Sequence, residues 1–208
     1  MAQHLARFAI AIALVTALGC AAEVKSNEEG LAELDAGRAH DVLVGEVEGS
    51  DVRVGALADD TRLRLFLCGG ASSFASATHW VRAELDADGD FSFSSDELEL
   101  EGSLVDGVLE AELTADGERA LVRAERVRDD TLAGLYEAKA ECGTVGLIVT
   151  HDGPDTEPTA QGACVGEGHL PDQVNPIKPI SLERSGTIEV EVVRGDEAMR
   201  VDLRAARL

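Results

Sequence analysis

A regular alternation of apolar and polar residues is the feature that most constrains the fold of this chain. In segments 62–67, 109–113 and 188–192, apolar residues at every second position alternate mainly with arginine or glutamate. Successive side chains of a β-strand point to opposite faces of its sheet, so this period of two is typical of half-buried antiparallel strands. No segment of helical length carries a convincing helical period. The chain is therefore expected to be all-β.

Short turn signals separate the alternating segments. Asp88-Gly89, Asp106-Gly107 and Asp116-Gly117 lie between them, and Asp-Gly favours tight hairpin turns because these turns need a positive φ. Turn signals recur about every ten residues, which leaves room mainly for pairing between strands that are neighbours in sequence. We therefore predict an antiparallel meander of about ten to twelve short strands that forms a closed or partly open barrel. A sandwich of two sheets is the alternative.

The first twenty residues have the composition of an export signal. The apolar run from Phe8 to Val15 is too short to span a bilayer and has the size of the apolar region of a signal peptide. Gly19 followed by Cys20 resembles the lipobox of bacterial lipoproteins, although Ala17 stands where leucine is commoner. The resemblance implies removal of residues 1–19, diacylation of Cys20 and attachment to a membrane of the bacterial cell envelope, at the outer membrane or the cell surface. Ordinary secretion is the alternative.

The rest of the chain divides into a tether and a folded part. Residues 20–40 are largely polar and are expected to be a flexible tether, whereas residues 41–208 suffice for a single β domain. Two stretches lack alternation: the small-residue segment 69–78, and segment 166–186 with three of the five prolines. Long loops in compact domains often carry function. These two loops are therefore the expected contact surfaces.

The charge of the chain excludes several classes of partner. It has 18 Lys and Arg against 40 Asp and Glu, a formal net charge of −22. Such a field repels the phosphates of nucleic acids and anionic lipid head groups. Aromatic residues make up 3% of the chain, too few for a platform that stacks sugars or bases. The expected partners are the membrane, through a lipid on Cys20, and another envelope protein or a small ligand, but no nucleic acid.

Three cysteines remain after Cys20, so one disulfide is expected in an oxidising compartment, and three pairings exist. Cys142 with Cys164 is favoured because their midpoint is Gly153, which lies in a turn signal. A hairpin about this turn places the two cysteines opposite each other. Cys68 then remains as a lone thiol at a strand end, and we expect it to be buried and inert. No cysteine or histidine spacing typical of zinc sites is present.

The acidic stretch from Asp86 to Glu97 suggests a metal hypothesis. Asp86, Asp88 and Asp90 fall at the first, third and fifth positions of a loop that resembles an EF-hand, and Glu97 falls at the twelfth. Phe91 stands where that loop needs glycine, and the flanking segments alternate like strands. A plain hairpin is therefore the favoured interpretation. The four carboxylates are the candidate ligands if calcium or another cation binds, and no other cofactor is expected.

A second resemblance rests on the order of apolar and glycine motifs between residues 42 and 165. These motifs are Leu65-Phe66-Leu67-Cys68-Gly69, Trp80, Phe91-x-Phe93, Leu98-x-Leu100-x-Gly102-x-Leu104, Gly134-Leu135-Tyr136 and Gly146-Leu147-Ile148-Val149. In this order they look similar to an uncharacterised group of small bacterial exported domains built from consecutive hairpins. The resemblance implies a β-meander and assigns no activity or catalytic residue.

The motifs together favour a binding role over catalysis. The sequence lacks a recognisable acid–base pair, an activated nucleophile and a phosphate-binding loop. We therefore expect a membrane-anchored envelope lipoprotein that acts as a non-enzymatic binding or structural module. A cation-dependent binding module that uses the loop 86–97 is the alternative.

Overall fold

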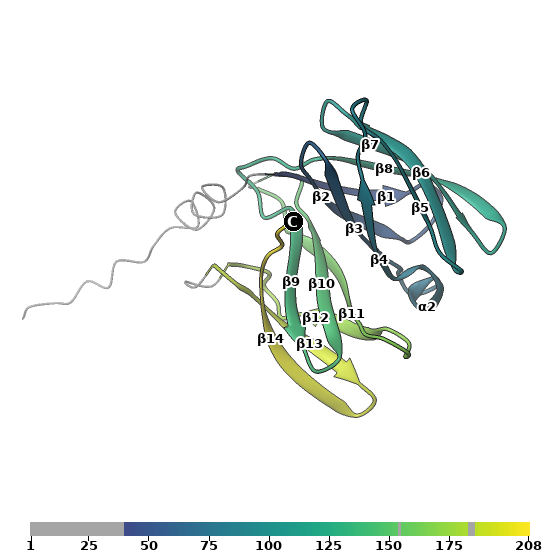
Figure 1. Cartoon of the computed structure of the whole chain (residues 1–208). Helices are drawn as coiled ribbons and strands as arrows, with labels where there is room; N and C mark the ends of the chain where they lie inside the picture. The colour runs from purple at the N-terminus through teal and green to yellow at the C-terminus, as the bar shows by residue number, and fades with distance from the viewer. Residues whose placement is uncertain (1–39, 154, 183–185) are drawn as a thin grey trace, which may run out of the picture.

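The computed structural model describes residues 40–153, 155–182 and 186–208 (Figure 1). These residues form fourteen strands and one short helix, α2 (Phe74–Ala77). The strands build two antiparallel sheets, and each sheet is a meander in which strands adjacent in sequence pair with each other. The predicted all-β meander is confirmed, with more strands than expected.

The first eight strands form one sheet in the order β4-β3-β2-β1-β8-β7-β6-β5. This is the order of an up-and-down barrel in which β1 closes on β8, while no ladder joins β4 to β5 among the described residues. The eight-stranded sheet is therefore a barrel left open at one seam. Its strands are β1 (Asp41–Val47), β2 (Arg53–Ala58), β3 (Arg62–Cys68), β4 (His79–Glu84), β5 (Asp90–Ser94), β6 (Leu98–Val105), β7 (Val108–Ala115) and β8 (Glu118–Arg126).

The last six strands form a closed barrel, because the final strand returns to pair with the first. A single link, residues 127–133, connects this six-stranded barrel to the eight-stranded sheet. Figure 1 shows the two sheets side by side, with the barrel in green to yellow. The strands of the barrel are β9 (Gly134–Ala140), β10 (Gly143–Thr150), β11 (Thr159–Val165), β12 (Asp172–Pro176), β13 (Ile188–Arg194) and β14 (Glu197–Ala205).

Two of the Asp-Gly signals form tight two-residue hairpin turns. Asp106 and Gly107 connect β6 to β7 with φ values of 53° and 77°. Asp116 and Gly117 connect β7 to β8 with φ values of 52° and 78°. A positive φ at both central residues gives the turn a twist that matches the twist of the flanking strands. These hairpins follow directly from the local sequence.

Each sheet encloses its own apolar core, built from alternate residues of the strands. The inner face of the eight-stranded sheet carries residues such as Leu43, Leu65 and Leu100, which are fully buried. The six-stranded barrel is filled by residues that include Leu147 and Val190. Burying such side chains stabilises a fold by roughly 1.5–3 kcal/mol each. The alternation of apolar and polar residues in the sequence thus produces two separate hydrophobic cores.

A third apolar cluster joins the two sheets through their outer faces. Phe66 on β3 stacks on Trp80 on β4, with ring centroids 4.4 Å apart. Gly146 on β10 lies beneath this aromatic pair, and a Cβ atom there would come within 2.7 Å of the Phe66 ring and 2.8 Å of the Trp80 ring. Glycine therefore permits the close approach between β10 and the aromatic pair.

An ion pair crosses the same junction. Arg64 on β3 donates from both terminal nitrogens to the Glu137 carboxylate on β9, with 2.9 Å between Nη1 and Oε1. The guanidinium also lies 4.4 Å from the centre of the Trp80 ring. A bidentate, partly buried ion pair of this kind restricts the relative orientation of the two strands as well as the distance between them. It therefore holds the sheets in one relative position.

The structure bears differently on the two ends of the predicted organisation. The predicted signal peptide 1–19, the predicted lipidation site Cys20 and the predicted tether up to residue 39 lie outside the described residues. Segment 166–186, predicted as one loop, contains the five-residue strand β12. The sequence concealed this strand because it is short and ends at Pro176, whose ring removes a backbone donor.

Candidate functional site

A cleft of about 540 Å³ lies where the two sheets meet. One wall comes from the segment after β3, with Gly69, Gly70, Ala71 and Phe74. The other wall comes from β11 and β12, with residues 160–162 and 173–176. Parts of the two stretches that were expected to make contacts, 69–78 and 166–186, therefore face each other across one cleft. Its volume falls within the range typical of ligand sites.

Asp51, in the turn between β1 and β2, fixes the first wall. Its Oδ2 atom accepts hydrogen bonds from the backbone nitrogen and the hydroxyl of Ser72, at 2.8 and 2.6 Å, and its Oδ1 atom accepts one from the Ser73 hydroxyl. These hydrogen bonds to the charged form hold the pKa of Asp51 well below its ordinary value. A Cβ atom on Gly70 would come within 2.7 Å of the Asp51 side chain. The wall is thus a backbone loop tied to a carboxylate.

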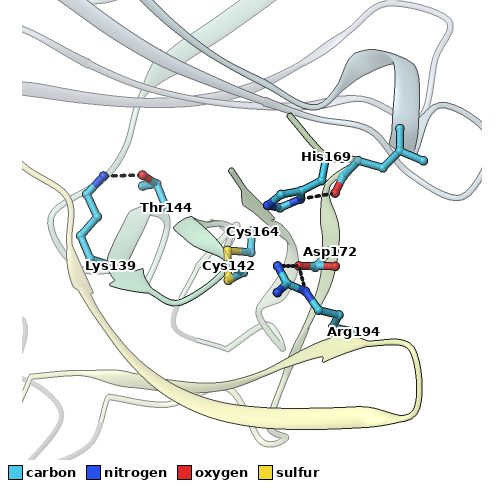
Figure 2. Close-up of a disulfide and its surroundings, with 8 residues drawn as sticks. Lys139, Cys142, Thr144, Cys164, His169, Asp172 and Arg194 are labelled. Atoms are coloured by element: carbon cyan, nitrogen blue, oxygen red, sulfur yellow. Dashed lines mark hydrogen bonds and ion pairs between the residues drawn. A yellow bond between two sulfur atoms is a disulfide. The ribbon is translucent and has the colours of Figure 1, made fainter. Parts of the chain in front are cut away.

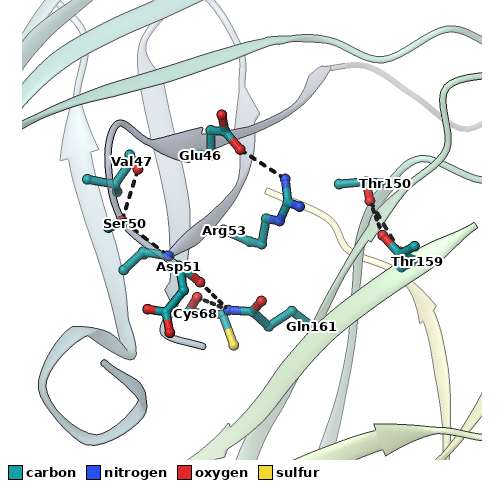
Figure 3. Close-up of polar contacts among 10 residues, drawn as sticks. Glu46, Val47, Ser50, Asp51, Arg53, Cys68, Thr150, Thr159 and Gln161 are labelled. Atoms are coloured by element: carbon teal, nitrogen blue, oxygen red, sulfur yellow. Dashed lines mark hydrogen bonds and ion pairs between the residues drawn. The ribbon is translucent and has the colours of Figure 1, made fainter. Parts of the chain in front are cut away.

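Gln161 ties the second wall to the eight-stranded sheet (Figure 3). Its Nε2 atom donates to the backbone oxygen of Asp51, at 3.1 Å, and to that of Cys68. Cys68 itself is buried, and burial raises the pKa of its thiol to about 12. The thiol is therefore protonated near neutral pH, as expected of an inert cysteine.

Polar contacts also order the strand β12. The Gln173 Nε2 atom donates to Asn175 Oδ1 at 3.0 Å, which links two side chains on the same strand. Asp172, at the start of the strand, forms an ion pair of 2.7 Å with Arg194 on β13 (Figure 2). The ion pair therefore fixes the first residue of β12, and the side-chain amides of Gln173 and Asn175 form the part of the second wall that follows.

The disulfide connects β11, which forms part of this wall, to the link between β9 and β10. Cys142, in the link between β9 and β10, is bonded to Cys164 on β11, with their Cα atoms 6.1 Å apart (Figure 2). The predicted pair is therefore present, but the predicted register is wrong. Cys164 lies opposite Val145, not opposite Cys142. The turn between β10 and β11 is centred beyond Gly153, so the bond joins a strand to a neighbouring turn.

The lining of the cleft is neutral. None of the described residues that line it carries a charge, although charged residues make up 28% of the chain. The lining combines glycine backbone, one phenylalanine ring and the side-chain amides of Gln161, Gln173 and Asn175. Amides and backbone groups both donate and accept hydrogen bonds. The cleft therefore suits an uncharged ligand that carries hydrogen-bonding groups of both kinds.

A larger hollow of about 800 Å³ lies at one end of the eight-stranded sheet and is lined by six aspartates. Several of these carboxylates hold turns. Asp59 Oδ1 accepts from the backbone nitrogen of Thr61 at 2.9 Å. Asp86 Oδ1 accepts from the backbone nitrogens of Asp88 and Asp90, both at 2.9 Å. The density of acids at this end is explained in part by their use as turn residues.

The four candidate calcium ligands do not come together. Asp86 and Asp88 lie in the turn before β5 and Asp90 is the first residue of that strand, whereas Glu97 follows the strand. The Glu97 Oε2 atom lies instead 3.3 Å from the Nδ1 atom of His79. Across residues 40–153, 155–182 and 186–208, no group of three or more acidic, histidine or cysteine residues is placed to hold a metal ion. The favoured plain hairpin about Asp88-Gly89 is wrong as well: this turn joins β4 to β5, but among the described residues no ladder pairs these two strands, and β5 pairs with β6 instead.

The sequence did not single out the residues that shape the cleft. Asp51 stands beside a Gly-Ser turn signal, and Gln161, Gln173 and Asn175 are ordinary polar residues in alternating or irregular segments. Their roles depend on contacts between β11, β12 and the loop after β3. A glutamine or asparagine outside any motif gives no indication in the sequence of which distant segment it will contact.

No helix in the described part of the chain is both long enough and apolar enough to cross a membrane. Comparison of the chain with protein-family models, with curated proteins and with solved structures finds no match.

Proposed function

We propose that this protein is a lipid-anchored binding protein of the bacterial cell envelope that holds another envelope protein in its neutral cleft. The observation that carries the proposal is the cleft itself, in which the segment after β3 and the strand β12 face each other without a charged lining residue. Attachment through Cys20 rests on the lipobox-like end of the signal sequence. The net charge of −22 argues for a protein partner over nucleic acid.

The chemistry of the cleft supports binding over catalysis. The amides of Gln161, Gln173 and Asn175 donate and accept hydrogen bonds, but they do not ionise near neutral pH. The nearby Cys68 thiol is protonated, and the Asp51 carboxylate is engaged by two serines. These groups orient a bound molecule but do not supply a general base or a nucleophile.

Photo-crosslinking tests the cleft. A photoreactive amino acid replaces Ala71, an exposed residue on the cleft wall, in bacterial cells that produce the full chain. The matched control carries the same group at Ala198, an exposed residue of the β13–β14 hairpin that does not line the cleft. A discrete adduct from position 71 that is absent from position 198 supports the proposal. Equal labelling from both positions, or no adduct from position 71, contradicts it.

Membrane fractionation tests the anchor separately. The wild-type chain is expected to sediment with membranes, and Cys20→Ala is expected to release it, because the thiol is the site of acylation. The adduct at position 71 shows in the same cells whether recognition persists without the anchor. Retention of Cys20→Ala on membranes would contradict lipid attachment through this residue.

A further inference from the structure

One edge of β11 is open where it lines the cleft. The ladder with β10 runs along the whole strand, from Thr159 to Val165. The ladder with β12 covers only Gly162 to Cys164. Among the described strands, none pairs with the second edge of residues 159–161. An open strand edge presents backbone donors and acceptors that another extended segment can pair with.

The cleft lies in the fork between β11 and β12. Beyond Val174, β12 continues along β13 through Asn175 and Pro176, without a pair on β11. Pro176 has no backbone N–H and so cannot donate a ladder hydrogen bond. The two strands therefore separate beside residues 160 and 161, which line the cleft.

The opposite wall leaves room for a backbone to approach. The Cβ directions of Gly69 and Gly70 point to Ser73 and Asp51 within the loop, so these residues present backbone to the cleft, and Ala71 adds only a methyl group. The lining also lacks a charge to pair with a charged side chain, which would lose hydration on entry without compensation. An acidic segment would in addition be repelled by the field of the chain. Shape and charge thus select an extended segment with small or uncharged side chains.

We propose that the cleft binds a short, uncharged peptide segment in extended conformation, which adds to the open edge of β11 at residues 159–161. The inference rests on the proposed function and names the class of ligand that the cleft holds. Residues 159–161 span about 10 Å as a strand, so about three ligand residues pair with them. Main-chain hydrogen bonds supply affinity, and the neutral lining selects the side chains.

Binding of a defined peptide to the full chain in detergent micelles tests the inference. The probe is a blocked pentapeptide of alternating threonine and valine, titrated while the backbone amide signals of residues 159–161 are followed by NMR. We expect saturable shifts at these amides. A peptide of the same sequence with alternate backbone nitrogens methylated on the pairing edge is expected to bind about tenfold or more weakly. The same loss is expected when the threonines are replaced by glutamates.

Two chain variants complete the test. Ala71→Trp fills the cleft and is expected to abolish the shifts, whereas Ala198→Trp is the matched control and is expected to keep them. Equal binding of the methylated peptide overturns main-chain pairing. Equal binding of the glutamate peptide overturns selection by neutrality. Among residues 159–161, an amide that does not donate to β10 and is already protected from exchange without peptide shows an occupied second edge, and this too overturns the inference.

The outcomes separate the inference from the proposed function. If the photoreactive group at position 71 captures a partner while the neutral peptide does not shift residues 159–161, the ligand class is wrong and the cleft is still the binding site. If the peptide binds but no partner is captured from position 71, strand addition stands and a protein partner held in the cleft is refuted. If both fail, both proposals fail.

Discussion

Loss of the Cys142–Cys164 disulfide is expected to lower the stability of the six-stranded barrel by an amount set by the loop it closes. The two cysteines are separated by 22 positions in the sequence. In the chain-entropy treatment, a loop of this length contributes about 3 kcal/mol to the free energy of unfolding. For a chain of this size, that corresponds to a fall in Tm of roughly 6–12 °C.

Thermal unfolding with two optical probes measures this effect. The chain has one tryptophan and one tyrosine. Trp80 lies at the junction of the sheets and Tyr136 is buried in the barrel core, so each reports on a different region. The double variant Cys142→Ala, Cys164→Ala should melt at the lower temperature with or without dithiothreitol, whereas the reductant should lower the Tm of the wild-type chain. A wild-type Tm that does not respond to full reduction would refute the reasoning.

Three further predictions concern a carboxylate and two kinds of glycine. Hydrogen bonds lower the pKa of Asp51, so its contribution to folding is present above the ordinary pKa of 3.8 and is lost as pH falls through the lower folded pKa. Protection of the Ser72 amide from exchange should decline with it, and a flat profile below pH 3.8 would count against these bonds. Gly117→Ala places a side chain at φ 78° in open space and should cost about 1–2 kcal/mol in urea unfolding, whereas Gly153→Ala, at a position without positive φ, should cost less. Gly146→Ala overpacks the aromatic junction and should cost about 1–3 kcal/mol with a shift in tryptophan emission; an unchanged spectrum would argue against the close approach.

The strands and hairpins were predictable because they depend on neighbouring residues. The alternation in segments 62–67 and 109–113 matches β3 and β7, and Asp116-Gly117 connects two strands as a tight turn. The division into two sheets was not predictable in the same way. The link 127–133 contains a turn signal like those within the meander, and nothing local distinguishes a turn between strands from a passage between sheets.

The candidate site was predictable in its parts but not as a whole. The two loops were identified because they lack alternation. They come together because Gly146 packs against Phe66 and Trp80, and these two aromatic residues lie far from Gly146 in the sequence. The open edge of β11 depends on where the β12 ladder stops. The disulfide pair was identified from an approximate midpoint, and that argument tolerated an error in register.

The position of β1 has a mechanical consequence. This first described strand begins at Asp41 and lies between β2 and β8, not at the edge of its sheet. A pull on the chain from its N-terminal side therefore loads two hydrogen-bonded ladders at once, because the bonds of both run across the strand. With the membrane attachment proposed at Cys20, tension on the chain would reach the fold through β1, which is hydrogen-bonded to a strand on each side. An anchored protein of this design would resist extraction of its first strand better than one that is tethered through an edge strand.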